Sequence, residues 1–497
     1  MQDSLVKFFI LLFSSIWIYY LVPKRTRWYV LLFASLVYYY LLSPHYLSVV
    51  VSAFTIFIGA ILIDKLALKK CDSDDKDEKK RFKQRIKFKK RLVLFITIIV
   101  NLGLLIYFKY TNFFVSIFSS SHSSLKIALP LGISYYTLIA ISYITDVYRG
   151  KTEHEKNFLK LFFYLTFFPC IIEGPIWRWA DAEQVFDGQK LDFKNIRIGI
   201  LLILFGLFQK MVIADRAGIL VNNVFGSNTY GLVSLSAMVL YTVQIYAEFA
   251  GFILMMQGGA MLYGINLPDN FKTPFFSKNV AEFWRRWHIT LGTFLKDYVF
   301  YPISLSKGLM KLNMFNSKHL PKFLAKFLVS AIPLFFVWFL NGLWHGASFK
   351  YIFYGLYYYI IMMIGLLLEP LFKKKDNKLL NCLKILRTLC LVLIGMTIFR
   401  ASSIGEAFNM VLSIFKFDGN VLSYGLAIND FIIILLYVLL MIIVGVLKEK
   451  NIMVRERLTE GSPLKKYVVY YLLLMMIVIF GIYGAGYNAS DFIYGQF

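Results

Sequence analysis

Long apolar segments recur along the chain from residue 5 to residue 488, and only short polar breaks separate them. A helix that crosses a bilayer needs about 20 apolar residues, and fewer where it is short or re-entrant. Candidate spans lie near residues 5–22, 28–42, 46–68, 92–110, 127–147, 158–177, 196–214, 231–263, 323–342, 350–370, 381–399, 428–447 and 467–488. This pattern predicts an all-α, polytopic integral membrane bundle of about 11 to 13 helices.

Two parts of the pattern are interrupted. Pro169 and Pro175 break one apolar run, whereas Arg285 and the charged residues after it interrupt another. Irregular backbone at membrane depth is tolerated only where protein or a water-filled cavity satisfies its polar groups. We therefore expect residues 169–180 and 270–302 to form re-entrant or short half-helices that line a cavity.

The composition agrees with a membrane protein. Of the 497 residues, 58% are hydrophobic and 18% are aromatic, whereas soluble domains are roughly 45 to 50% apolar. Because apolar segments continue through the whole chain, we expect a single membrane domain over residues 1–497 and no separate soluble domain.

The net charge of +25 does not indicate a nucleic-acid partner, because the basic residues cluster in short loops between apolar spans. Positive-inside orientation and anionic lipid headgroups account for such clusters. Residues 24–27 and 69–91 are separated by two predicted spans, so both are expected in the cytoplasm. The interpretation is a multi-pass protein of a cell membrane, with residues 69–91 as a basic cytoplasmic loop in contact with membrane lipid.

His345 is the most informative residue, because it lies in the otherwise apolar segment 338–348. An ionisable side chain at membrane depth is costly and indicates a functional site by default. Gly342 and Gly346 flank it and allow close backbone approach. A neutral imidazole accepts a hydroxyl proton, so the pattern favours a general base for acyl transfer. The alternative is a core histidine that bonds a backbone carbonyl.

A second histidine, His288, follows two tryptophans and two arginines within a few positions. Arg285 and Arg286 would hold phosphate groups of a donor by charge-assisted hydrogen bonds. Trp284 and Trp287 would stack on a planar ring or a cation. On one continuous helix, Trp284 and His288 share a face. The alternative is an interfacial helix with an aromatic belt and snorkelling arginines.

Other chemistries have no support in the sequence. It contains no Gly-x-Ser-x-Gly elbow, Walker loop or His-Glu-x-x-His motif, which removes the basis for a hydrolase, a nucleotide-driven enzyme or a zinc peptidase. The cysteines are scattered without a Cys-x-x-Cys pair, so neither a metal site nor a disulfide framework is expected.

Several motifs together extend over most of the chain: 129–136, 167–169 with 174–176 and Arg178, 206–216, 241–246, 268–271, 283–291, 297–298, 342–347, 399–401 and 491–494. They resemble membrane-bound O-acyltransferases, and within that family the membrane subunit of bacterial alginate and related polysaccharide O-acetyltransferases. The resemblance implies that His345 matches the family's catalytic histidine and His288 its second important histidine. It also implies a helical bundle around a central funnel.

The resemblance further implies that residues 167–347 and their flanking helices form the catalytic core. No bound cofactor is expected, and acetyl-CoA is the implied acyl donor. The acyl group would pass to an extracytoplasmic acetyltransferase partner or directly to a polysaccharide acceptor. We expect the following residues to line the cavity: Glu173, Arg178, Asp297, Asn341 and Trp344.

The chain departs from the family pattern at residues 247–256, where an aspartate and a serine-rich run are usual. Glu248 stands as a replacement carboxylate, whereas Ile253 and Leu254 are apolar. We therefore expect the wall near Ile253 to differ from that of the relatives.

Three alternative functions stay open. D-alanyl transfer to teichoic acid from a carrier-protein thioester is the first, although the long tail after residue 401 favours acetyl transfer. A transporter or flippase of lipid-linked sugars fits the span count and the broken helices, but no inverted repeat is visible. A passive scaffold for a secreted acetylase is the third, and it predicts that His345 is dispensable.

Overall fold

The computed structural model describes residues 2–43, 45–118, 125, 127–227, 231–368, 377–416, 419–459 and 462–483. The motif at 491–494 lies outside these described residues. Within them the chain forms helices and irregular connections, with no β-strand and one antiparallel bridge between Phe271 and Trp287. The predicted all-α membrane bundle is confirmed.

Nine of the described helical segments are long and apolar enough to cross a membrane. They comprise α1 (Gln2–Leu21), α3 (Leu47–Ala67), α4 (Lys76–Phe118), α8 (Phe193–Leu207) with η2 (Phe208–Ala214) and α9 (Asp215–Val224), α10 (Leu232–Leu262), α15 (Lys322–His345), α16 (Phe349–Leu368), α17 (Lys378–Arg400) and α19 (Ile428–Glu449). Each overlaps a span that the apolar pattern predicts, although Lys76–Phe118 and Phe193–Val224 extend well beyond the predicted 92–110 and 196–214.

The remaining predicted spans form shorter apolar helices, and residues 484–488 of the last predicted span lie outside the described residues. These are α2 (Arg27–Leu42), α5 (Ile133–Arg149), α6 (Phe158–Thr166) and α21 (Pro463–Phe480). The other helices are short: α7 (Trp179–Glu183), α11 (Val280–Arg286), α12 (Ile289–Leu295), α13 (Tyr301–Ser304), α14 (Lys307–His319), α18 (Ile404–Ser413) and α20 (Val454–Thr459). Single turns complete the fold: η1 (Lys24–Thr26), η3 (Pro274–Phe276), η4 (Lys296–Phe300), η6 (Ile414–Lys416) and η7 (Val421–Tyr424).

Residue contacts divide the chain into two units. The first, here called the N-terminal unit, comprises residues 2–192 and 259–267. The second, the C-terminal unit, comprises residues 193–258 and 268–497. Both histidines of interest belong to the C-terminal unit.

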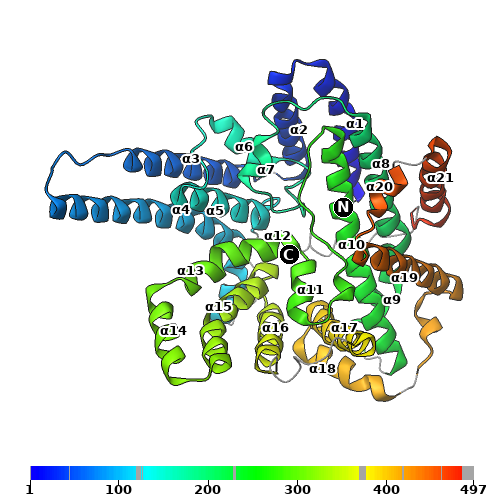
Figure 1. The fold of residues 1–497 in the computed structure, drawn as a ribbon. Coiled ribbons are helices and arrows are strands. Elements are labelled where there is room, and N and C mark those ends of the chain that lie inside the picture. The colour runs from blue at the N-terminus through cyan, green and yellow to red at the C-terminus, as the bar shows by residue number, and fades with distance from the viewer. Residues whose placement is uncertain are drawn as a thin grey trace. The chain divides into compact units, whose positions relative to one another are not determined.

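In the N-terminal unit, α3 and α4 run side by side (Figure 1). Helix α4 has 43 residues, which corresponds to about 65 Å at 1.5 Å per residue. Asp75 caps its N-terminus by accepting hydrogen bonds from the backbone N–H groups of Asp77 (3.0 Å) and Glu78 (3.3 Å). The predicted basic loop 69–91 is therefore helical from Lys76 onward, because its lysines, arginines and glutamate are good helix formers.

The irregular segment 167–178 is largely buried in the N-terminal unit. The predicted break in the apolar run at Pro169 and Pro175 is confirmed, but residues 169–178 form no half-helix, and a helix begins only at Trp179. Trp177 and Tyr164 of α6 exchange two hydrogen bonds, one from the indole Nε1 to the Tyr164 carbonyl oxygen (3.1 Å) and one from the Tyr164 hydroxyl to the Trp177 carbonyl oxygen (3.2 Å). The Trp177 ring also stacks on Phe167 with centroids 5.0 Å apart. These contacts satisfy polar groups of a non-helical backbone without water.

In the C-terminal unit, α15 and α16 pack as an antiparallel pair that two glycines bring close together (Figure 1). A Cβ atom on Gly342 would overlap the carbonyl oxygen of Tyr351, and a Cβ atom on Gly355 would overlap that of Trp338. Backbone atoms have little freedom to move aside, so glycine is required at both positions. The close approach that the sequence predicted at Gly342 is confirmed.

Candidate functional site

His345 is the last residue of α15 and is only 2% exposed. The helix ends there because Gly346 adopts an extended conformation, with its N–H bonded to the carbonyl oxygen of Leu343 (3.1 Å). Asn341 lies one turn earlier on the same face and is also buried. The C-terminal turn of α15 thus places an imidazole and an amide side by side in a buried setting.

His288 lies at a break between α11 and α12, where it adopts a left-handed backbone conformation with φ 48° and ψ 52°. Such a conformation costs an L-residue roughly 1 to 2 kcal/mol. The prediction that Trp284 and His288 share a face of one helix is therefore wrong, because α11 ends at Arg286. The predicted broken character of residues 270–302 is confirmed.

An incoming strand-like segment holds this break in place. The Lys272 N–H donates to the Arg286 carbonyl oxygen (2.9 Å), and the Ile289 N–H donates to the Asn270 carbonyl oxygen (3.1 Å). These bonds fasten the backbone on both sides of His288. The left-handed turn is consequently fixed by residues that lie well before it in the chain.

The side chain of Asn270 adds a third support to the break. Its Oδ1 accepts hydrogen bonds from the backbone N–H of Thr290 (3.0 Å) and from the Thr290 hydroxyl (2.7 Å). Asn270 is 0% exposed. Its Nδ2 has no hydrogen-bond partner among the residues that the structure describes. The sequence assigned no role to Asn270, although it falls in the motif 268–271.

One tryptophan links the two histidines. The Trp344 ring centroid lies 5.7 Å from that of His288 and 5.0 Å from that of His345. Phe249 makes an edge contact with His288 at 4.8 Å, and Phe399 makes one with His345 at 5.1 Å. The structure therefore brings both predicted histidines into one buried aromatic cluster.

Burial decides the protonation state of His288, which lies outside the nine candidate spans. It lowers the pKa of the imidazole to about 3, so the ring is neutral near pH 7. An unfolded histidine takes up its proton near pH 6.5. As the pH falls, the unfolded state becomes protonated near pH 6.5 and the folded state only near pH 3. His288 therefore contributes to the stability of the fold above about pH 6.5, and this contribution is lost as the pH falls toward 3.

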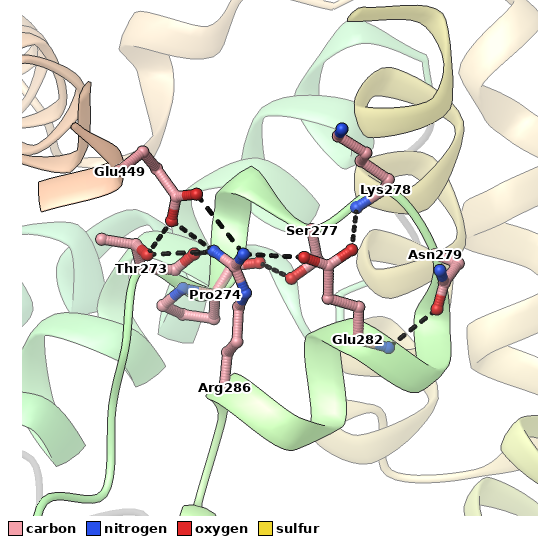
Figure 2. A network of polar contacts seen from close by, with 8 residues as sticks. All are labelled: Thr273, Pro274, Ser277, Lys278, Asn279, Glu282, Arg286 and Glu449. Carbon is pink, nitrogen blue, oxygen red and sulfur yellow. Dashed lines mark hydrogen bonds and ion pairs between the residues drawn. The ribbon is translucent and has the colours of Figure 1, made fainter. Parts of the chain in front are cut away.

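Arg286 is held in a network of polar contacts (Figure 2). Its guanidinium pairs with Glu282 at 2.7 Å, with the carboxylate of Glu449, and with the Thr273 hydroxyl at 3.1 Å. Thr273 also donates a hydrogen bond to Glu449 (2.6 Å). Arg286 thereby joins α11 to α19 and to the segment before η3, and two carboxylates already neutralise its charge.

Arg285 differs from its neighbour. It is exposed, and it forms no ion pair or hydrogen bond with any residue in the described ranges. Its guanidinium N–H groups can therefore donate to an anionic ligand, whereas those of Arg286 already bond Glu282 and Glu449. Arg285 and Arg286, for which the sequence predicted the same phosphate-binding role, therefore differ in their contacts.

The two predicted tryptophans also differ. Trp287 is 1% exposed and stacks on Phe283 with centroids 5.5 Å apart, so we place it in the aromatic core rather than at a donor site. Trp284 is only partly buried and contacts Tyr358 at 4.8 Å. Its Nε1 has no acceptor within the described part of the chain. Trp284 also lies near Tyr354 (6.3 Å), which contacts His345.

The other predicted cavity residues lie in different parts of the fold. Glu173 is buried in the irregular segment of the N-terminal unit, and Arg178 precedes α7, where its N–H donates to Asp181 (2.9 Å). Asp297 lies in the π-helical turn η4 and is partly buried. Over the described ranges, no group of three or more His, Cys, Asp or Glu side chains is arranged to hold a metal ion.

A buried cluster of three charges was missed by the sequence analysis. In the π-helical turn η2, Lys210 pairs with Asp215 (2.8 Å) and with Glu248 of α10 (2.9 Å). All three side chains are buried. Charges inside the predicted spans 196–214 and 231–263 would have indicated such a cluster. Glu248, the residue that departs from the family pattern, thus has a lysine partner.

A family model described as the membrane-bound O-acyltransferase family matches residues 152–403, which include both histidines and Asn270. The probable alginate O-acetylase AlgI of Pseudomonas aeruginosa is 33% identical over 334 residues, 65% of this chain and 60% of that protein.

Two further relatives act on other polymers, according to their names. The peptidoglycan O-acetyltransferase of Helicobacter pylori is 29% identical over 367 residues, 66% of this chain and 66% of that protein. The teichoic acid D-alanyltransferase of Bacillus subtilis is 31% identical over 290 residues, 54% of this chain and 68% of that protein. The matched region of this chain spans about 60% of the length of the alginate relatives.

Proposed function

This chain belongs to the membrane-bound O-acyltransferase family, and we propose that it moves an acetyl group from a cytoplasmic thioester donor toward hydroxyls of a cell-surface polysaccharide, with His345 as general base. The observation that carries the proposal is the buried contact of Trp344 with both His345 and His288. Acetyl-CoA is the proposed donor. The acceptor is a polysaccharide or an extracytoplasmic acetyltransferase partner in the bacterial cytoplasmic membrane.

The proposed reaction needs one base. The imidazole of His345 takes the proton of the acceptor hydroxyl while the oxygen attacks the thioester carbonyl carbon. A C–O bond forms, the C–S bond breaks, and the proton passes from the imidazole to the departing thiolate. The apolar rings around His345 exclude water, which would otherwise compete as the acceptor.

His288 has a supporting role in this proposal. Because burial lowers its pKa to about 3, it acts as a neutral hydrogen-bonding group and not as a cation. Its contact with Trp344 (5.7 Å between centroids) favours a part in orienting the tryptophan that lies next to the base. Asn341 and Trp344 complete the proposed surroundings of His345 on α15.

Arg285 is the proposed contact for donor phosphates, and Arg286 is the proposed structural residue. We expect Arg285→Ala to raise the KM for acetyl-CoA about 5- to 10-fold with little change in kcat, the loss of roughly 1 kcal/mol of binding.

We expect Arg286→Ala to lower the free energy of unfolding by about 1 to 2 kcal/mol, because Glu282 and Glu449 lose their shared partner.

Steady-state kinetics in proteoliposomes and thermal melting in detergent measure both effects. Each variant serves as the control for the other, since the residues are adjacent and carry the same charge. A raised KM confined to Arg286→Ala, with an unchanged melting temperature, would reverse the two assignments.

The proposed function itself is tested with purified protein in vesicles supplied with labelled acetyl-CoA on one side. Appearance of the label on an acceptor polysaccharide or partner protein supports acetyl transfer. Movement of intact sugar-lipid without transfer of label would support a transporter instead. The similarity to the teichoic acid D-alanyltransferase keeps D-alanyl transfer as the alternative. Incubation with a D-alanyl carrier-protein thioester separates that alternative from acetyl transfer.

A further inference from the structure

The amide of Asn270 is oriented by its bonds to Thr290. A backbone N–H only donates, so the side-chain atom that accepts from the Thr290 N–H (3.0 Å) has to be Oδ1. The Thr290 hydroxyl, 2.7 Å from the same oxygen, fixes the amide plane further. The position of Nδ2 follows from these two contacts and involves no ambiguity between the two ends of the amide.

The Nδ2 of Asn270 is a buried hydrogen-bond donor for which the described residues supply no acceptor. The residue is fully buried, and its NH₂ group has no acceptor among the described residues. A buried polar group without a partner costs about 1 to 3 kcal/mol. Native proteins keep few such groups, and each calls for an explanation, such as a catalytic role.

The backbone strain at His288 is a second energetic cost, close to Asn270. His288, whose neighbour Ile289 bonds the Asn270 carbonyl oxygen (3.1 Å), has a left-handed backbone conformation. Strained backbone persists only where the surrounding structure enforces it, and it concentrates at active sites and ligand clamps. His288, the strained residue, contacts Trp344, and Trp344 contacts His345.

We propose that Asn270 is a catalytic residue that donates a hydrogen bond from Nδ2 to the carbonyl oxygen of the acyl donor. The inference rests on the proposed acyl transfer. When the acceptor oxygen attacks, the C=O electron pair moves onto this oxygen, and the Asn270 N–H stabilises the resulting oxyanion. Collapse of the tetrahedral intermediate re-forms the C=O bond and expels the thiolate.

The competing explanation is that Asn270 has a purely structural role through Oδ1. An aspartate at this position retains an acceptor for both Thr290 bonds and has nearly the same shape. If the role is structural, Asn270→Asp keeps the turn and the activity. If Nδ2 donates to the oxyanion, the same variant replaces a donor by a negative charge where negative charge develops.

We expect Asn270→Asp to reduce kcat for acetyl transfer about 10²- to 10³-fold, the usual effect of removing one oxyanion donor. The KM for acetyl-CoA and the melting temperature stay close to the wild-type values. The ratio of variant to wild-type activity rises as the pH falls, because the introduced carboxyl group regains a donor once it is protonated. His288 stays neutral throughout this pH range, since burial lowers its pKa to about 3.

Asn316 offers a matched control. It lies in α14, is buried, and also has an Nδ2 without a partner among the described residues. Asn316→Asp makes the same chemical change at another buried position, and we expect it to leave kcat unchanged.

Thr290→Val removes one of the two hydrogen bonds that orient the Asn270 amide. We expect kcat to fall about 10-fold with the protein level intact, roughly the loss of one hydrogen bond.

Two results would overturn the proposal: activity of Asn270→Asp within a few-fold of wild type, or a loss that is independent of pH and shared by Asn316→Asp. If Asn270→Asp does not accumulate in the membrane, an unchanged kcat in Thr290→Val overturns it. Wild-type protein that transfers no label refutes the proposed function together with this inference, whereas active wild type with active Asn270→Asp refutes the inference alone.

Discussion

His345→Ala is expected to reduce acetyl transfer by at least about 10²- to 10⁴-fold, the contribution of a well-placed general base. The imidazole is the buried titratable group at the end of α15, and alanine offers no atom that accepts the hydroxyl proton. The experiment measures label transferred from acetyl-CoA by purified variant in proteoliposomes, together with the amount of protein inserted in the membrane. Insertion should be unaffected, because the contact of Gly342 with Tyr351 that positions α15 remains.

His319 provides the control for this variant. It is an exposed residue of α14, and its Nδ1 lies 2.8 Å from the carbonyl oxygen of Phe315 while its ring stacks on the Phe315 ring at 4.4 Å. His319→Ala should retain full transfer activity. Wild-type transfer by His345→Ala would contradict the assignment and would favour a scaffold whose histidine is dispensable.

Lys210→Met is expected to lower the free energy of unfolding by about 3 to 5 kcal/mol, the usual cost of breaking a buried ion pair from one side. The substitution leaves the carboxylates of Asp215 and Glu248 buried without their shared cation. The effect should appear as a large drop in melting temperature in detergent and as a strong reduction in the level of membrane-inserted protein.

A variant with all three charges removed is the informative comparison. Lys210→Met combined with Asp215→Asn and Glu248→Gln should recover most of the lost stability, because no uncompensated charge stays buried. The cluster would have no structural importance if Lys210→Met melted at the wild-type temperature. Recovery of stability without recovery of acetyl transfer would instead show that the charges matter for activity.

The membrane helices were predictable because each is set by a continuous apolar run. The predicted span 381–399 became α17 (Lys378–Arg400), and the span 323–342 became α15 (Lys322–His345). The basic segment 69–91 was expected as a loop, since its charges exclude it from the bilayer. Charge does not exclude a helix in water, however, and α4 extends through most of that segment.

The details of the candidate site depend on contacts between distant residues, which local patterns do not contain. The break at His288 is bonded by Asn270, whose side chain accepts from Thr290 at a separation of 20 residues. The difference between Arg285 and Arg286 depends on Glu449, which is 163 residues away from Arg286 in the chain. Composition and spacing indicated which residue types matter, but they did not distinguish a ligand contact from an internal ion pair.

The glycine contacts between α15 and α16 have a consequence for how this protein evolves. They join Cα positions to carbonyl oxygens, so the depth of His345 in the fold is set by backbone and not by exchangeable side chains. Exposed residues of the same helix, such as Phe336 and Leu340, take no part in these contacts. Their identity can drift as the lipids of the host membrane change, while the base stays in place.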